Sequence, residues 1–186
     1  MKKWALFLLM LLGLSGCSAE SGEMERGLAL RTKLLQASGF SFDAEITADY
    51  GDKLHQFSMN CQADGQGDVV FTVTAPETIA GITGTIAQEG GALTFDDVAL
   101  HFDLLTDEQL SPVSAPWILM KTLRSGYLRT VGQEDEGLRL TIDDSYAENA
   151  LMLDIWLDDQ DLPKRAEILY DGRRILTLLV RNQTLL

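Results

Sequence analysis

Hydrophobic or small side chains alternate with polar ones along residues 40–50. Phe42, Ala44 and Ile46 hold even positions, whereas Asp43 and Glu45 hold odd positions. Because neighbouring side chains of a strand point to opposite faces, this pattern predicts an antiparallel strand with one buried and one solvated face. The same alternation predicts strands over 53–63, 69–75, 138–142, 151–157, 162–170 and 173–180, and weaker strands over 82–88, 92–95 and 98–102.

Two stretches instead have a helical period. Residues 23–38 place acidic side chains early and basic ones late, Gly39 follows as a stop signal, and Leu28, Leu34, Leu35 and Ala37 are predicted to form the apolar stripe. The second helix is predicted around 117–123, with prolines before it and Gly126 after it. Nine to eleven strands and two helices predict an α+β fold: a curved antiparallel sheet, or half-open β-barrel, with one helix at the N-terminus and one across the concave face. Residues 23–186 are expected to form a single domain.

The first residues have the pattern of an export signal. A positive start, Met1-Lys2-Lys3, precedes an apolar run over 4–14 that is too short to span a bilayer. Leu14-Ser15-Gly16-Cys17 then resembles the lipobox of bacterial lipoproteins. This resemblance predicts a signal peptide over 1–16, lipidation (a palmitate-type acyl anchor) at Cys17 and a short tether over 17–22. The mature protein is expected on the extracytoplasmic face of the cell membrane.

Charge narrows the classes of partner. The chain has 186 residues, 28 acidic against 15 basic, and a formal net charge of −13. Such a surface repels phosphate backbones, so nucleic acid is not an expected partner. With Cys17 lipidated, Cys61 has no partner for a disulfide, and its position among apolar residues predicts a buried free thiol.

Residues that could carry chemistry are sparse. His55 and His101 have no Cys, His or Glu at metal-ligand spacing, and the pairs around Asp96, Asp143 and Asp158 fall where strands end, which is typical of turns. Nucleophile motifs and a phosphate-binding glycine loop are missing from the sequence. We therefore expect no catalytic residues, no metal site and no cofactor.

The number of apolar side chains, by contrast, points to a possible binding function. Buried faces recur on nearly every strand, yet only two helices are available to cover them. The side chains expected between sheet and helix, either as a hydrophobic cavity or as plain core, are Phe42, Ile46, Phe57, Met59, Phe71, Val73, Trp117, Ile118, Met120, Leu140, Leu153 and Ile155.

The order of these elements resembles a known family. A lipobox, an amphipathic helix, a meander opening on Phe-x-Phe-x-Ala-x-Ile at 40–46, a Pro-flanked helix and a final Arg-Arg-Ile-Leu-Thr-Leu at 173–178 are similar to the LolA/LolB superfamily of lipoprotein carriers. Germination-type lipoproteins of clostridia share that fold. The resemblance implies a membrane-anchored, non-catalytic protein that binds a lipid, acyl chain or lipoprotein. The alternatives are an envelope or sporulation accessory protein that binds a partner protein, and a hydrolase with a scattered site.

Overall fold

A computed structural model describes residues 18–95, 98–102, 105–106, 109–147 and 150–186. The signal peptide and Cys17, predicted from the sequence, lie outside the described residues. In chain order the elements are α2 (Ser18–Gln36), β1 (Gly39–Asp49), β2 (Leu54–Asp64), β3 (Val69–Ala75), η1 (Glu77–Ile79), β4 (Thr83–Ala87), β5 (Gly90–Phe95), β6 (Val98–Phe102), β7 (Leu105–Thr106), β8 (Gln109–Leu110), η2 (Pro112–Ser114), α3 (Ala115–Ser125), β9 (Tyr127–Glu134), β10 (Gly137–Asp143), β11 (Met152–Leu157), β12 (Pro163–Tyr170) and β13 (Arg173–Leu185).

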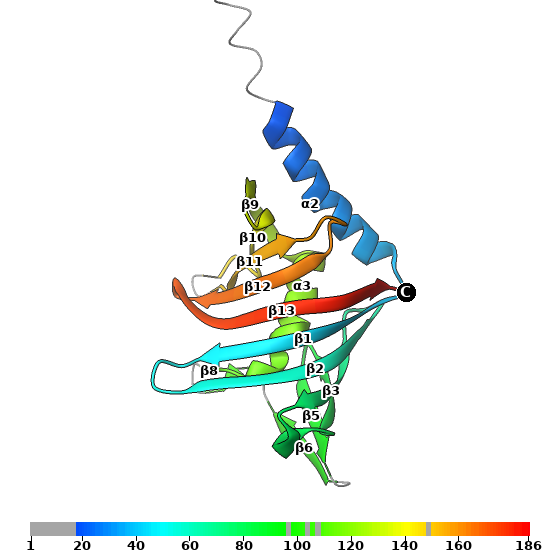
Figure 1. Cartoon of the computed structure of the whole chain (residues 1–186), viewed down its shortest axis with the longest axis vertical. Helices are drawn as coiled ribbons and strands as arrows, with labels where there is room; N and C mark the ends of the chain where they lie inside the picture. The colour runs from blue at the N-terminus through cyan, green and yellow to red at the C-terminus, as the bar shows by residue number, and fades with distance from the viewer. Residues whose placement is uncertain (1–17, 96–97, 103–104, 107–108, 148–149) are drawn as a thin grey trace, which may run out of the picture.

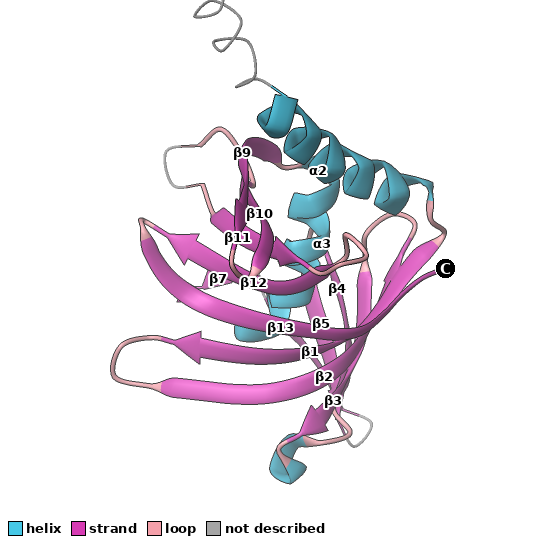
Figure 2. Cartoon of the chain, turned by 45° about the horizontal axis from the view of Figure 1, so that its top comes forward, coloured by secondary structure: helices cyan, strands magenta, loops and turns pink. Residues whose placement is uncertain are grey.

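Eleven strands form one curved antiparallel sheet. Its order is β6-β5-β4-β3-β2-β1-β13-β12-β11-β10-β9, so two meanders meet where β1 pairs with β13 (Figure 1). The helix α3 lies on the concave side and contacts β2, β10 and β13, while α2 packs on β9 and α3 at one end (Figure 2). The predicted fold class is confirmed, including the helix across the concave face. Among the described residues, no helix is both long and apolar enough to cross a membrane.

The alternation of the sequence becomes the two faces of this sheet. In β1 the even residues from Phe42 to Ala48 are at most 2% exposed, and the odd residues between them are partly exposed. Register carries the buried face across the sheet: Ile46 lies opposite Phe57 on β2 and opposite Leu178 on β13. Residues of this set line the concave, or inner, face, and the alternate residues form the outer face.

The first helix differs from the prediction in its start and in its buried stripe. It begins at Ser18, so residues 18–22, predicted as a tether, are helical; Ser-Ala-Glu-Ser-Gly contains no proline to stop a helix. Its buried face is Gly27, Leu30 and Leu34, whereas Leu28 and Leu35 are 48% and 54% exposed. Leu34 and Leu35 lie about 100° apart around the helix, so both cannot face the sheet.

Two further differences concern the second meander. The strand β9 was not predicted, because this edge strand has no regular alternation and all its residues are exposed or only partly buried. Trp156 alternates along β11 with Leu153, Ile155 and Leu157 of the inner face, so it lies on the outer face, yet it is 6% exposed. The guanidinium of Arg165 lies 4.6 Å from its ring centroid, and its Nε1 donates a hydrogen bond to Glu134 Oε2 (2.9 Å), so polar neighbours cover it on the outer face.

Candidate functional site

The inner face beneath α3 is the region that the sequence singled out, and the structure brings its predicted residues together. All twelve predicted side chains belong to one apolar cluster, and none is more than 8% exposed. Eight residues of α3 are buried: Trp117, Ile118 and Met120 of the predicted set, and five others that include Leu119 and Leu123. The twelve side chains therefore lie in the hydrophobic core, and a cavity among them stays a prediction.

Two arginines fasten the C-terminal end of α3 to α2. Arg31 of α2 donates from Nε to the carbonyl oxygen of Leu123 on α3 (2.8 Å). In return, Arg124 of α3 donates to the carbonyl oxygen of Leu34 on α2 (2.7 Å) and to that of Gly65 (2.6 Å). Each helix thus receives a cation at carbonyl groups of its last turns, where the helix dipole favours positive charge. Burial lowers the pKa of the Arg31 guanidinium.

The chain before α3 is fixed to the opposite end of the sheet. The Tyr50 hydroxyl, just after β1, donates to the carbonyl oxygen of Leu110 (2.6 Å). Partial burial raises the pKa of Tyr50, so the hydroxyl remains a donor well into the alkaline range. Ser114 Oγ donates to the carbonyl oxygen of Ser111 (2.5 Å), which closes the single turn that precedes α3. Hydrogen bonds at both ends therefore hold α3 across the concave face. Sequence reasoning missed them, because most of their acceptors are backbone carbonyls far along the chain.

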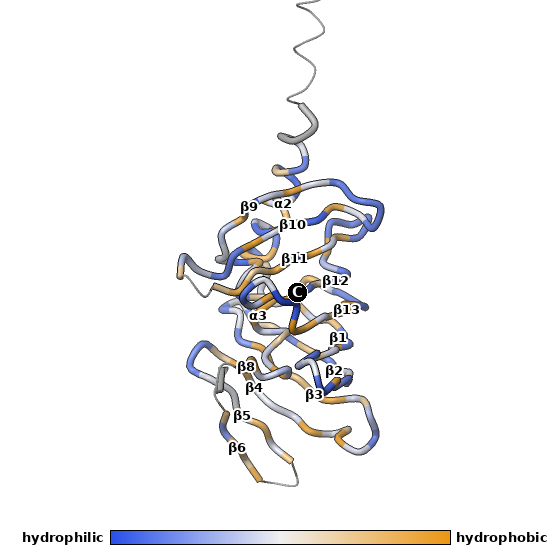
Figure 3. Tube along the Cα trace, turned by 90° about the vertical axis from the view of Figure 1, so that its left-hand side faces the viewer, coloured by the Kyte–Doolittle hydropathy of each residue, from blue (hydrophilic) through white to orange (hydrophobic). Residues whose placement is uncertain are grey.

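Beyond α3 the apolar inner face continues over β5 and β6, where several of its side chains are exposed. Gly91 lies opposite Phe102, Leu93 opposite Leu100, and Phe95 opposite Val98, so these residues of β5 and β6 share the face of Phe71 and Ile86. Leu93 and Phe102 pack against the core, but Phe95, Val98 and Leu100 are 48%, 59% and 61% exposed. Figure 3 shows the hydrophobic character of these two strands. We call Phe95, Val98 and Leu100 the open apolar face.

Glycines shape the transition from core to open apolar face. A Cβ at Gly84 would lie 2.6 Å from Cζ of Phe71, and a Cβ at Gly91 would lie 2.1 Å from Cζ of Phe102. Both distances are far below van der Waals contact, so only glycine lets the two rings lie flat on the sheet. Gly84 and Gly91 therefore have a packing role.

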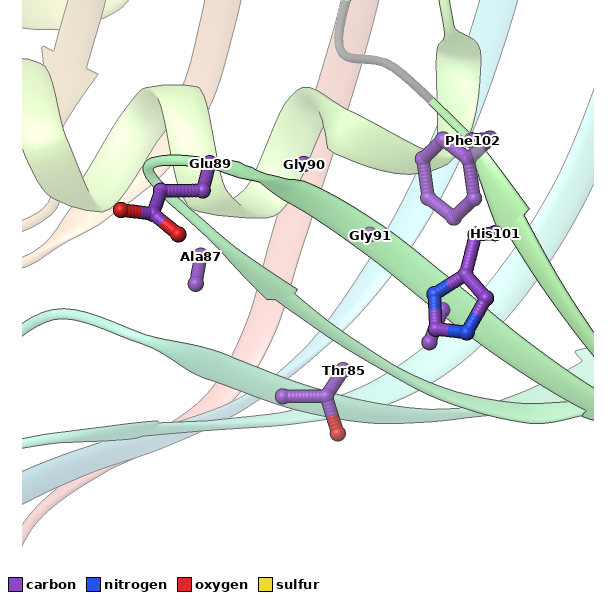
Figure 4. A pocket seen from close by; sticks show the side chains of 8 residues that line it. Thr85, Ala87, Glu89, Gly90, Gly91, His101 and Phe102 are labelled. Atoms are coloured by element: carbon purple, nitrogen blue, oxygen red, sulfur yellow. The ribbon is translucent and has the colours of Figure 1, made fainter.

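The same strands border a hollow of about 430 Å³ whose lining mixes polar and apolar residues. Thr85, Glu89 and His101 are among its lining residues, together with Phe102 from the edge strand (Figure 4). His101 and His55 are both exposed. The described part of the chain contains no group of three or more His, Cys, Asp or Glu that could hold a metal ion.

The acidic clusters of the described residues have structural partners. Asp143 pairs with Arg129 (3.4 Å) and Asp144 with Lys121 (3.6 Å). Asp158 Oδ1 accepts hydrogen bonds from the backbone N–H groups of residues 160 and 162, as a turn aspartate does. The pair Asp96-Asp97 lies outside the described residues.

Cys61 is the buried free thiol that the sequence predicts. It is 4% exposed and lies between Phe42 and Phe71 on the inner face. Burial, together with the negative charge of Asp43, raises the pKa of the thiol far above its usual range. The thiol is therefore held protonated and unreactive.

Comparison with known proteins gives structural neighbours only. No protein-family model and no curated protein sequence matches the chain. A LolA superfamily protein from Nitrosomonas europaea aligns with 10% identity over 86% of this chain and 93% of its own, with a TM-score of 0.48. An uncharacterized conserved protein from Thermus thermophilus aligns with 11% identity over 88% and 87%, also at 0.48. The lipoprotein LppX of Mycobacterium tuberculosis aligns with 12% identity over 90% and 96%, at 0.42.

A LolA superfamily protein is among the solved structures similar to this chain. The similarity concerns the fold. At these identities no residue role is carried over, and the function is argued from the side chains of this chain alone.

Proposed function

We propose that this protein is a non-catalytic binding protein that holds an apolar ligand, such as an acyl chain, against its inner sheet face. The observation that carries the proposal is the open apolar face. Phe95, Val98 and Leu100 continue the core without interruption, and each is about half or more exposed. Exposing such a contiguous set is costly in water unless something covers it during function.

An acyl chain fits this surface by shape and by chemistry. The paired strands β5 and β6 offer a row of aliphatic and aromatic side chains that leads from the sheet edge to Phe71 beneath α3. The residues of the open apolar face are uncharged, so an extended hydrocarbon buries them without stranding a charge. Each methylene that leaves water contributes about 0.8 kcal/mol.

We propose further that lipid at Cys17 anchors the protein to the membrane, where such ligands are found. Metabolic labelling with a palmitate analogue tests this step: the wild-type protein should be labelled and Cys17→Ala should not. Labelling that persists in Cys17→Ala would refute the anchor, but it would leave the ligand site standing.

The binding test uses residues 18–186, which carry every described element, after circular dichroism has verified their β-sheet spectrum. The probe is a dansylated undecanoic acid, whose fluorescence rises in an apolar site. Leu100→Asp should weaken binding at least tenfold, because it places a carboxylate on the open apolar face. Ala99→Asp is the matched control: it adds the same charge one residue away on the exposed outer face of the same strand, and it should bind as the wild type does.

Several outcomes would count against the proposal. Absence of probe binding by the wild type would refute it directly. Equal loss in both variants would mean that damage to strand β6, rather than the loss of an apolar contact, had been measured.

The alternative, a partner protein, is favoured by one separate observation. The strand β6 is an edge of the sheet, where a partner's strand could pair. Native mass spectrometry of protein purified from membranes separates the two functions. Co-purified lipid supports the ligand site, whereas protein that is reproducibly free of lipid supports the partner.

A further inference from the structure

An exposed pair of tyrosines marks a second region, on the outer face of the other meander. Tyr127 begins β9, and Tyr146 follows β10. Their ring centroids are 3.6 Å apart, and Tyr146 is 83% exposed. The two rings are tilted by 35° to each other, and Tyr146 leaves most of its apolar ring in water. Tyrosine is a frequent anchor of binding sites because it combines an apolar ring with a polar end.

A hollow of about 430 Å³ lies beside Tyr146. Its floor is a row of cross-strand neighbours: Asp143 on β10 lies opposite Met152 on β11, and Met152 lies opposite Leu169 on β12. Asp143 also lies opposite Tyr127 on β9, so the tyrosine pair and the floor belong to the same row. The adjacent residues in sequence, such as Ile142, are buried on the inner face, which places the hollow on the outer face.

The lining combines apolar surface with polar groups of both signs. Met152 and Leu169 supply the apolar floor, while Arg129, Asp143 and Asp171 supply a guanidinium and two carboxylates. Arg129 Nε lies 3.4 Å from Asp143 Oδ2, so part of this charge is already paired. An anionic ligand would meet the carboxylates of Asp143 and Asp171, and its only cationic partner in this lining, Arg129, is already paired. A neutral ligand with hydroxyl groups would find both donors and acceptors.

We propose that this hollow binds a neutral glycan, with one pyranose ring stacked on the outward face of Tyr146. A pyranose ring has an apolar face of C–H groups, which suits an aromatic ring, and a rim of hydroxyls. Those hydroxyls donate to the carboxylates of Asp143 and Asp171 and accept from the guanidinium of Arg129. The site lies on the face opposite the open apolar face, so it is independent of the function proposed above.

Isothermal titration calorimetry of the full chain in a polyoxyethylene detergent, which contains no sugar, tests this site. The probes are chitotetraose and cellotetraose, two neutral β-linked tetrasaccharides that differ in their acetamido groups. We expect the wild type to bind at least one of them. We expect Tyr146→Ala to raise its Kd at least tenfold, and Tyr127→Ala, which removes only the supporting ring, to raise it less.

Phe95→Ala, in the open apolar face, is the control for specificity. It should leave glycan binding unchanged and weaken binding of the dansylated fatty acid. Tyr146→Ala should weaken glycan binding and leave binding of the dansylated fatty acid unchanged. Failure of the glycan site thus differs from failure of the apolar site. The proposal is overturned if the wild type binds neither tetrasaccharide at millimolar concentration, or if Tyr146→Ala binds as tightly as the wild type.

Discussion

Replacing Arg124 by Met removes the hydrogen bonds that fasten α3 and keeps most of the apolar stem. The guanidinium donates to two carbonyl oxygens on different segments, those of Leu34 and Gly65. A hydrogen bond from a charged donor contributes about 1.5–3 kcal/mol. Because Arg124 is only partly buried, water replaces part of each bond, and we expect a loss of about 2–3 kcal/mol in the free energy of unfolding. For a domain of this size, that corresponds to a fall in Tm of about 5–10 °C.

Urea unfolding of residues 18–186, followed by tryptophan fluorescence, measures this loss, since Trp117 lies within α3. Arg124→Lys should recover about half of the stability, because an ammonium group reaches one carbonyl but does not span both. Arg173→Met is the matched control: Arg173 also donates to a backbone carbonyl, that of Asp49, but it is exposed. If Arg124→Met and Arg173→Met shift the urea midpoint equally, the reasoning about the fastening of α3 is wrong.

Four further predictions concern single buried or strained positions. In residues 18–186, Cys61 should resist iodoacetamide at pH 8 and react fully in urea, because burial holds the thiol protonated; rapid native alkylation would contradict this. Thr122→Val should raise the free energy of unfolding by about 1 kcal/mol, and with it the urea midpoint, because the buried Thr122 hydroxyl has no hydrogen-bond partner among the described residues. Gly91→Ala should lower the free energy of unfolding by about 1–3 kcal/mol, since the new Cβ meets the ring of Phe102. An unchanged Tm would refute that contact. The pKa of Tyr50 is raised above its ordinary value of 10.0, so the Tyr50 hydroxyl stabilises the fold fully below that pH and stabilises it less as the pH rises further. In Tyr50→Phe this alkaline decline of the urea midpoint should be absent.

Most strands could be predicted because they have one solvated and one buried face, which makes polar and apolar residues alternate along the sequence. β1, β3 and β6 begin and end within one residue of the predicted limits. β9 could not be predicted in this way, because as an edge strand with every residue at least partly exposed it has no reason to alternate. The rotation of α2 also escaped prediction, because a helix with leucines on two sides is oriented by what it packs against.

The candidate sites also contain some features that the alternation of residues predicts and others that it does not. The twelve inner residues were predicted from the pattern of apolar positions in the strands and in the second helix, and all of them lie in the core. The exposure of Phe95 and Leu100 could not be predicted, because the alternation along a strand shows which side chains share a face but not whether α3 covers them. The Tyr127–Tyr146 pair depends on register between strands and on a loop, and neither can be deduced from spacing along the chain.

The pairing of β1 with β13 determines how the fold can assemble. Each meander is built from hairpins whose partners are close in sequence, but within the sheet the two meanders pair through β1 and β13, which are separated by almost the entire described chain. Such distant pairing is slow, because a long loop must close before any contact compensates for the lost entropy. Until β13 arrives, the inner side chains of β1 remain open on one flank, so a chain emerging from a membrane would depend on its final strand to become one sheet.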